Sequence, residues 1–229
     1  MNAKQIIATG IVTAMLGLVP TVASAQEGPY FGLFWGKGRT DVDKSDLDSV
    51  AVDLATGAGG TNTAGASSLN DTDSVWGAQI GYRFNRFVAA EIGYVDLGKT
   101  NYTSELDANF GTPVVVGFDV DQRLLSSGPT VAVLGMFPIG QRFDVYGRAG
   151  IYFADTRYRI KVQFVGDPEI ISSEEKAGTQ EFFGGFGFAW NINESYALRT
   201  ELTYFNDVGD DDRTGEASST LITLGFQFR

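Results

Sequence analysis

Six charged residues stand on segments otherwise made of small and apolar residues, where buried charges could do chemistry. They are Arg83, Glu91, Asp144, Arg148, Arg199 and Glu201. The carboxylates Glu91 and Glu201 could serve as the acid and base of a hydrolase. Three basic residues balance the three acidic ones, however, and an unpaired charge in a narrow interior would cost several kcal/mol. We therefore expect a structural network of ion pairs, and not an acid–base site.

The absence of two residue types limits the reactions that the chain could catalyse. Its 229 residues include no His and no Cys. This excludes Ser-His-Asp triads, histidine bases, thiolate nucleophiles, disulfides and most zinc sites. A net charge of -11 argues against a nucleic-acid partner, which would need a basic footprint. We expect no catalytic residue, no metal and no cofactor.

Two acidic clusters could instead bind Ca²⁺. They are Asp41, Asp43, Asp46 and Asp48, and then Asp207, Asp210, Asp211 and Asp212. An EF-hand that began at Asp41 would need Gly and Glu at the positions that Asp46 and Val52 occupy. We interpret both clusters as solvated loops, with divalent bridging to lipopolysaccharide phosphates as the alternative.

The elements that carry the six charges are predicted to be β-strands. Apolar and polar residues alternate with a period of two in eight segments rich in aromatic and β-branched residues. These segments are 30–36, 74–84, 88–95, 130–137, 143–153, 182–190, 198–204 and 222–228. One face of each is large and apolar, as in Trp76, Ile80 and Tyr82. The opposite face is small or charged, as in Gln79 and Arg83.

These two faces distinguish a membrane barrel from a soluble one. Eight strands enclose an interior only just filled by side chains, so the large apolar face does not fit inside. Lipid accepts that face on the outside, and ring closure satisfies every backbone group. We predict an all-β, eight-stranded antiparallel up-and-down transmembrane β-barrel with small and polar side chains inside. A soluble lipocalin-like barrel is the alternative.

The connections between the predicted strands alternate in length. The short ones lie around 85–86, 138–141 and 191–195, and the long ones span 37–73, 96–112, 155–180 and 206–217. This is the pattern of outer-membrane barrels, with short periplasmic turns and long extracellular loops. We predict that 114–118 and 158–162 pair above the membrane, with a bulge or kink at 126–129. The glycine-rich stretch 57–68 is interpreted as a flexible spacer.

The N-terminus has the pattern of an export signal. Lys4 precedes an apolar run over 6–19, and small residues precede a cleavage point after Ala25. The apolar run is too short to span a membrane as a helix. We expect a cleaved signal peptide over 1–25 and one barrel domain over 26–229, exported through the periplasm.

Motifs in order along nearly all of the mature chain resemble the OmpA-like outer-membrane barrel family. They are 81–85 with 90–98, 137–140 with 146–150, 199–209 and 224–228. The resemblance implies the bacterial outer membrane. The last motif resembles an aromatic C-terminal assembly signal formed by Phe226 and Phe228, although Arg229 follows it. Some family members add a peptidoglycan-binding domain that this sequence lacks, so we expect no wall tethering.

Large aromatic residues on the apolar face are expected to anchor the barrel at or in the lipid. They are Trp35, Trp76, Tyr82, Tyr94, Trp190 and Tyr204. The expected partners are outer-membrane lipid, lipopolysaccharide and the outer-membrane assembly machinery, and we expect a monomer. Three functions stay open: a structural envelope barrel without catalysis, which we favour, a small pore or channel, and surface adhesion or recognition through the outer loops.

Overall fold

Long antiparallel strands make up most of the chain. The computed structural model describes residues 27–57, 59–109, 115–165, 169–210 and 214–229. The elements are β1 (Gly28–Asp41), α2 (Lys44–Gly57), β2 (Thr61–Asn70), β3 (Thr72–Arg83), β4 (Val88–Asn109), β5 (Val115–Ile139), β6 (Phe143–Phe164), β7 (Ile170–Asn191), β8 (Tyr196–Asp210) and β9 (Gly215–Phe228). The predicted signal peptide over 1–25 lies outside the described residues. All eight predicted strands are present, whereas α2 and β2 were not predicted.

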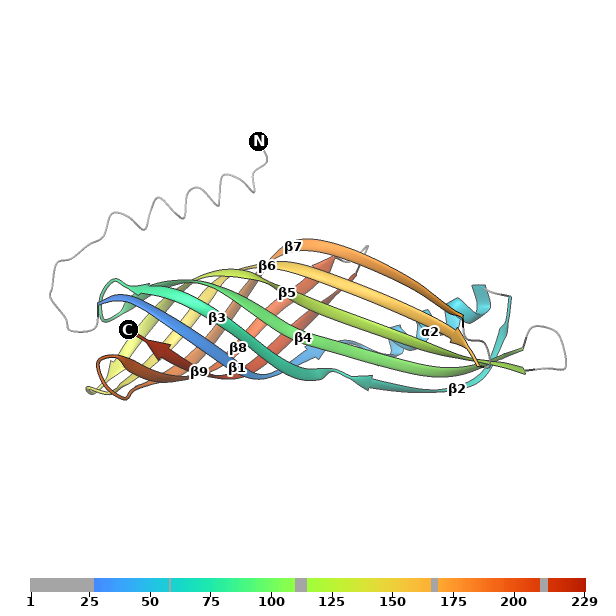
Figure 1. Ribbon diagram of the computed structural model, residues 1–229, viewed down its shortest axis with the longest axis horizontal. Coiled ribbons are helices and arrows are strands. Elements are labelled where there is room, and N and C mark those ends of the chain that lie inside the picture. The colour runs from blue at the N-terminus through green and yellow to red at the C-terminus, as the bar shows by residue number, and fades with distance from the viewer. Residues whose placement is uncertain (1–26, 58, 110–114, 166–168, 211–213) are drawn as a thin grey trace, which may run out of the picture.

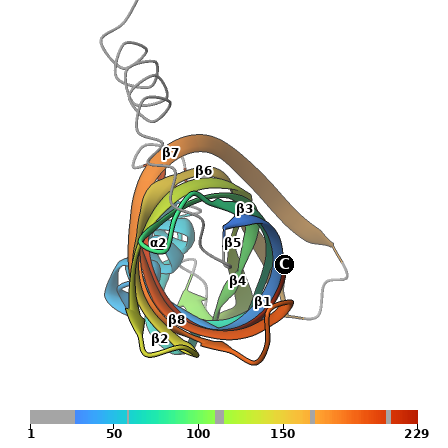
Figure 2. The same cartoon turned by 90° about the vertical axis from the view of Figure 1, so that its left-hand side faces the viewer.

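Eight of the strands close into a ring. β1 pairs with both β3 and β9, and β4 pairs with both β3 and β5, all antiparallel. The remaining neighbours follow in chain order from β5 to β9. Figure 2 shows the ring from one end, and Figure 1 shows its inclined strands from the side. The predicted eight-stranded antiparallel up-and-down barrel is confirmed.

Short turns join the strands at one end of the ring, where β1 begins and β9 ends (Figure 1). Asn85 and Asn193 build two of these turns in the same way. The side-chain oxygen of each accepts hydrogen bonds of 2.7 to 3.0 Å from the backbone N–H groups two and three residues further on. Gly140 provides the positive φ of 70° in the third turn. The periplasmic turns are therefore specified locally by the sequence.

At the other end the sheet continues beyond the ring as an extension of five strands, β2, β4, β5, β6 and β7 (Figure 1). β8 pairs with β7 only from Phe183 to Asn191, so the first half of β7 belongs to the extension. The ranges 96–112 and 155–180, predicted as long loops, are therefore mostly strand. The stretch 61–70, which overlaps the predicted spacer 57–68, is β2 and pairs with β4.

The β5–β6 hairpin extends above the membrane as predicted, but in another register. Phe118 pairs with Phe164, and Leu124 pairs with Tyr158, so 114–118 and 158–162 are not directly opposite. A bulge or kink is predicted over 126–129 of β5; the pairing with β6 is interrupted at 128–129, but the register does not shift, so β5 has no bulge there. The register instead shifts on β4, between Asp96 and Lys99. Gly98 has a φ of 82° there, a conformation that a residue with a Cβ adopts only under strain.

α2 covers the inner face of the extension. Ala51 and the neighbouring Leu47 pack against Tyr102, Leu106 and Phe118. The prediction of a solvated acidic loop over 41–48 is therefore wrong, because this stretch ends β1 and begins α2. Among the described residues, no helix is long and apolar enough to cross a membrane.

Side chains on the ring strands point alternately inward and outward, as predicted. Trp76 and Ile80 on the outside are 54% and 57% exposed, whereas Gln79 and Arg83 on the inside are 5% and 1% exposed. The expectation that only small and polar groups fill the interior is wrong. Phe183 and Phe205 also point inward, with rings stacked at 5.0 Å, inside an apolar cluster. The lumen therefore has a polar layer and an apolar layer.

Candidate functional site in the barrel lumen

An ion pair crosses the lumen near the short turns. Arg83 on β3 and Asp144 on β6 form two hydrogen bonds of 3.2 Å, in fork geometry. Asn191 donates to the same carboxylate at 2.9 Å, and Arg83 also donates to the carbonyl of Arg86. Both charged residues are 1% exposed. This pair therefore ties together two strands that are not neighbours in the ring.

Four more charges form a closed network further along the lumen. Glu91 on β4 lies 3.3 Å from Arg148 on β6 and 2.5 Å from Arg199 on β8. Glu201 on β8 lies 3.0 and 3.2 Å from the same two arginines. Each carboxylate faces two guanidinium groups, and each guanidinium group faces two carboxylates. The structure thus brings all six predicted inward charges into ion pairs, with a net charge of zero.

Four neutral side chains donate hydrogen bonds to the two carboxylates of this network. Tyr30 (2.7 Å) and Gln79 (3.3 Å) donate to Glu91, and Tyr146 (2.9 Å) and Thr203 (2.7 Å) donate to Glu201. These four partners are not among the residues predicted from the sequence. Strand periodicity could have identified them, because each lies at an inward-facing position and every second residue of a barrel strand points into the lumen.

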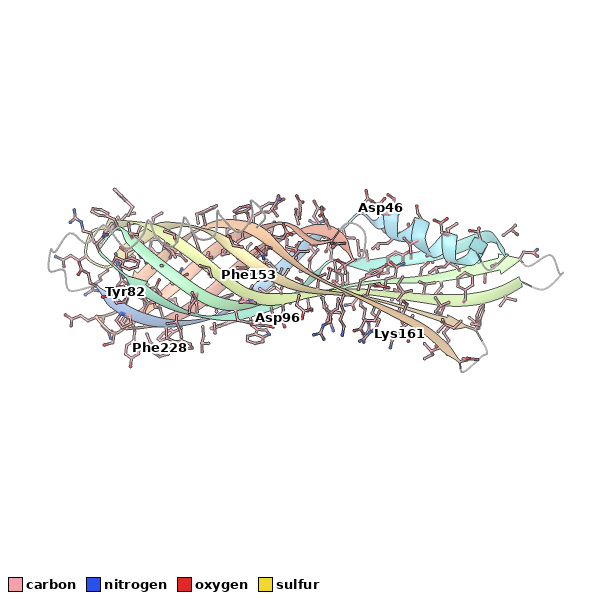
Figure 3. The ribbon with its side chains drawn as sticks, turned by 90° about the horizontal axis from the view of Figure 1, so that it is seen from above. Asp46, Tyr82, Asp96, Phe153, Lys161 and Phe228 are labelled. Atoms are coloured by element: carbon pink, nitrogen blue, oxygen red, sulfur yellow. The ribbon has the colours of Figure 1, made fainter. Side chains whose placement is uncertain are left out.

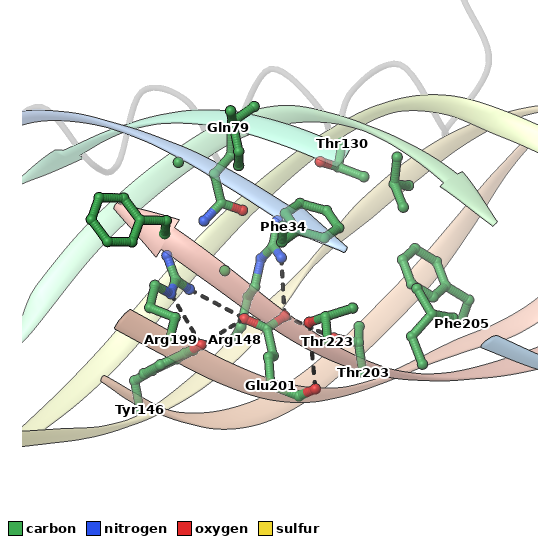
Figure 4. Close-up of a pocket in the computed structure, with 16 residues that line it drawn as sticks. Phe34, Gln79, Thr130, Tyr146, Arg148, Arg199, Glu201, Thr203, Phe205 and Thr223 are labelled. Atoms are coloured by element: carbon green, nitrogen blue, oxygen red, sulfur yellow. Dashed lines mark hydrogen bonds and ion pairs between the residues drawn. The ribbon is translucent and has the colours of Figure 1, made fainter. Parts of the chain in front are cut away.

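The network and the apolar layer leave little empty space between them (Figure 4). The cavity at this level has a volume of about 20 Å³, which is room for about one water molecule. Phe34 and Phe205 border it on one side, and Arg148, Arg199 and Glu201 border it on the other. The lumen is therefore filled at this level.

This arrangement neutralises the buried charges and connects strands of the ring through non-covalent ion pairs. Glu91 and Glu201, the candidate acid and base, are both engaged with the same arginines. Glu91 Oε2 and Arg148 Nε make an ion contact that lacks hydrogen-bond geometry. In the described parts of the chain, no group of three or more carboxylates is placed to hold a metal ion.

The predicted lipid anchors all lie on the outer surface of the ring. Trp35, Trp76, Tyr82, Tyr94, Trp190 and Tyr204 are between 42% and 57% exposed. Phe226 and Phe228 lie at the end of β9, with ring centroids 4.9 Å apart, and both contact Tyr196. This position fits an assembly signal, which stays a prediction.

A closed antiparallel ring with an apolar outer surface and a filled interior defines a β-barrel of the bacterial outer membrane. The chain belongs to the family of the OmpA-like transmembrane domain, whose family model matches residues 29–229. It is 28% identical to outer membrane protein A of Yersinia pseudotuberculosis and 30% identical to that of Escherichia fergusonii. Each match covers 67% of this chain, which spans 39% of the length of each relative.

Several solved outer-membrane barrels are similar to this chain. Ail of Yersinia pestis has a TM-score of 0.38 at 15% identity, covering 88% of this chain and 99% of that chain. Neisserial surface protein A has a TM-score of 0.44 at 13% identity, covering 91% and 99%. The outer membrane protease OmpT from Escherichia coli has a TM-score of 0.47 at 9% identity, covering 92% and 99%.

Proposed function

We propose that this protein is a structural barrel of the outer membrane, with a closed lumen and no catalytic activity. The observation that carries the proposal is the complete pairing of the six lumen charges, beside a cavity of about 20 Å³. A hydrated ion would have to break buried ion pairs and displace the Phe34, Phe183 and Phe205 side chains to pass. This favours a structural lumen over a conducting one.

The chemistry of the chain supports the non-catalytic part of the proposal. The sequence offers no His and no Cys as base or nucleophile. The two buried glutamates of the network each accept charge-assisted hydrogen bonds from arginine, so both side chains are engaged in ion pairs.

Single-channel recording tests the closed lumen. The chain refolded in a planar phosphatidylcholine bilayer is expected to show no unitary conductance, with a heat-dependent gel shift as the folding control. The variant Phe34→Ala/Phe183→Ala/Phe205→Ala, which empties the apolar layer, is the matched comparison for an opened lumen. A reproducible wild-type conductance that changes on Arg83→Gln or Arg148→Gln would establish a pore instead.

Deletion of the gene tests the envelope role. We expect the source bacterium to become more sensitive to detergents, and the full chain to restore its resistance. An unchanged envelope after deletion would contradict a structural role even if the lumen proves silent.

Surface recognition is a second candidate, favoured by the extension that projects beyond the ring (Figure 1). Between α2, β4 and β5 this extension contains a cavity of about 310 Å³, lined by Leu47, Val50, Tyr102, Leu124 and Tyr158 among others. Removal of the extension would abolish adhesion of the bacterium to a target cell while leaving the barrel folded, if this candidate is right.

A further inference from the structure

The outer face of the extension carries a band of basic side chains just beyond the lipid-facing surface. The basic band consists of Lys99, Arg123, Arg157, Arg159, Lys161 and Lys176. These residues alternate along their strands with buried or half-buried residues that point inward, such as Gln122 and Tyr158. Figure 3 shows nitrogen atoms gathered on this side of the sheet, next to the labelled Lys161.

Strand register places the members of the band next to one another. Lys99 pairs with Leu125, Leu125 with Arg157, and Arg157 with Lys176. In the next row outward, Arg123 pairs with Arg159. Lys161 follows two residues after Arg159 on β6. Six residues from four strands, distant in sequence, thus form one continuous surface.

The basic band is positive in an acidic protein. The carboxylates on these rows are Asp121 and Glu174, and the row just below holds Asp96 and Asp155, so six cations face four anions, whereas the whole chain has a net charge of -11. Two of these carboxylates are used within the band. Asp155 contacts Arg157 at 3.5 Å, and Glu174 contacts both Arg159 and Lys176.

Three cations of the band are unpaired. Within the described residues, Lys99, Arg123 and Lys161 take part in no ion pair, and Lys99 and Arg123 are exposed. Cross-strand neighbours of like sign repel each other, as between Arg123 and Arg159. An anion bound between them would remove this repulsion.

The height of the band matches the head-group layer of the membrane. Phe153 is a lipid-facing residue of β6, and Arg157 follows four residues later (Figure 3 labels Phe153 and Lys161 on this strand). Four residues span about 13 Å along a strand, or roughly 9 Å in height at the usual tilt of such barrels. Polar head groups begin within that distance of the hydrocarbon edge.

We propose that the basic band binds the phosphate groups of lipopolysaccharide in the outer leaflet. Guanidinium forks match phosphate oxygens in geometry, and lysine adds point charges to them. Lipid phosphates at this height would lie next to the outer face of the basic band. They would pair with its unpaired cations. The inference rests on the outer-membrane location of the barrel, and it is independent of whether the lumen conducts.

Binding of labelled lipid A to the refolded chain in zwitterionic detergent micelles tests the proposal. The variant Arg123→Gln/Lys161→Gln removes two unpaired cations and is expected to bind roughly 30-fold more weakly. The conservative variant Arg123→Lys/Lys161→Arg should bind like wild type. Arg86→Gln/Arg142→Gln removes the same charge at the periplasmic turns and is the matched control, also expected to bind like wild type. The heat-dependent gel shift verifies that each variant is folded.

Chemical removal of the lipid A phosphates provides the second arm of the test. When the probe is dephosphorylated lipid A, wild type should bind it no more tightly than Arg123→Gln/Lys161→Gln does. Equal binding of the two probes by wild type, or unchanged binding by that variant, would overturn the proposal. Displacement of lipid A by inorganic phosphate or by heparin at equal phosphate or sulfate concentration would assign the band to a soluble anion, and would overturn it as well.

Discussion

Each charged side chain inside this barrel lies next to at least one side chain of opposite charge. Removing a carboxylate or a guanidinium group from water is costly, and a buried pair repays that cost only when the remaining lone pairs and protons are also satisfied. Asp144 meets this condition through Arg83 and Asn191, at distances of 2.9 to 3.2 Å. The loss of a single partner should therefore be far more damaging than the loss of both.

Arg83→Gln is expected to destabilise the barrel by about 3–5 kcal/mol, because it removes the guanidinium group that pairs with the buried Asp144 carboxylate. The double variant Arg83→Gln/Asp144→Asn should recover part of this loss. Urea unfolding in phosphatidylcholine vesicles, followed by the heat-dependent gel shift, measures both values. If the double variant is less stable than the single one, the pair does not couple as the geometry implies.

A charged substitution on the outer surface of the ring tests whether that surface faces lipid. Ile80 and Ile92 are cross-strand neighbours on the outside, 57% and 60% exposed. Ile92→Arg should cost about 2–4 kcal/mol if this position lies near the bilayer midplane. Thr103→Arg, on the outer face of the extension, should cost almost nothing. The same urea titration compares them, and equal stability of the two variants would place Ile92 outside the lipid.

The six lumen charges could be identified from sequence because strand parity assigns each to the inward face. Their pairing could not be identified in the same way. Which arginine meets which glutamate depends on contacts between β4, β6 and β8 across the lumen, and strand periodicity contains no information on such distances. The inward phenylalanines Phe34, Phe183 and Phe205 were overlooked for a related reason, because large apolar residues occur on both faces of their strands.

Among the elements, α2 has a sequence pattern that indicates a helix. Leu47, Ala51 and Leu54 follow one another at helical spacing, and the side chain of Asp43 accepts a hydrogen bond of 2.8 Å from the backbone of Ser45. The aspartates in this stretch favour a solvated loop in the sequence, and that interpretation is wrong. β2 could not be foreseen, because its small residues have little strand preference and it is held by backbone pairing with β4.

A charged hydrogen bond outside the membrane adds to the apolar contacts that dock α2. Tyr102 on β4 donates to Asp48 at 2.5 Å, and this bond holds the pKa of the Asp48 carboxyl below its ordinary value. Asp48→Asn should weaken the docking by at most about 1 kcal/mol, since the site is half-exposed. Amide signals of α2 in the NMR spectrum report on this, and Asp53→Asn on the exposed side of α2 is the matched control.

Acid should have the same effect as that substitution. A carboxyl group with a lowered pKa in the folded state stabilises the structure above its ordinary pKa, near 3.9, and this contribution is lost as the pH falls through the lowered value. We therefore expect the α2 amide signals of wild type to shift below about pH 4 towards those of Asp48→Asn. Signals that stay unchanged down to acid unfolding of the barrel would contradict the role of Asp48.

The whole molecule consists of two regions with separate interiors. The ring encloses the ion pairs and the apolar cluster around Phe183 and Phe205. The extension has its own apolar cluster, built around Tyr102, Phe118 and α2. One region is solvated by lipid and the other by water, so each should keep its structure through its own contacts.

Trimming the extension tests this independence. Short turns would replace 41–70, 100–124 and 158–175, joining residues that are already neighbours, such as Lys99 and Leu125. The trimmed chain should fold in lipid and keep the heat-dependent gel shift, because the ring and its ion pairs are intact. A ring variant, Phe183→Ala/Phe205→Ala, should lose more stability than the trimmed chain. Failure of the trimmed chain to fold would mean that the extension supports the barrel.

The outer edge of β7 has a consequence for how these molecules coexist in a crowded membrane. Within the described residues, no strand pairs with this edge between Ile170 and Phe182. Such an edge is a template on which other chains can stack and aggregate. Glu174, Glu175 and Lys176 lie in the middle of it, and an added strand would have to strip water from their charges. These charges therefore disfavour fibre formation at this edge. Neighbouring barrels can lie next to one another without pairing their strands into one sheet.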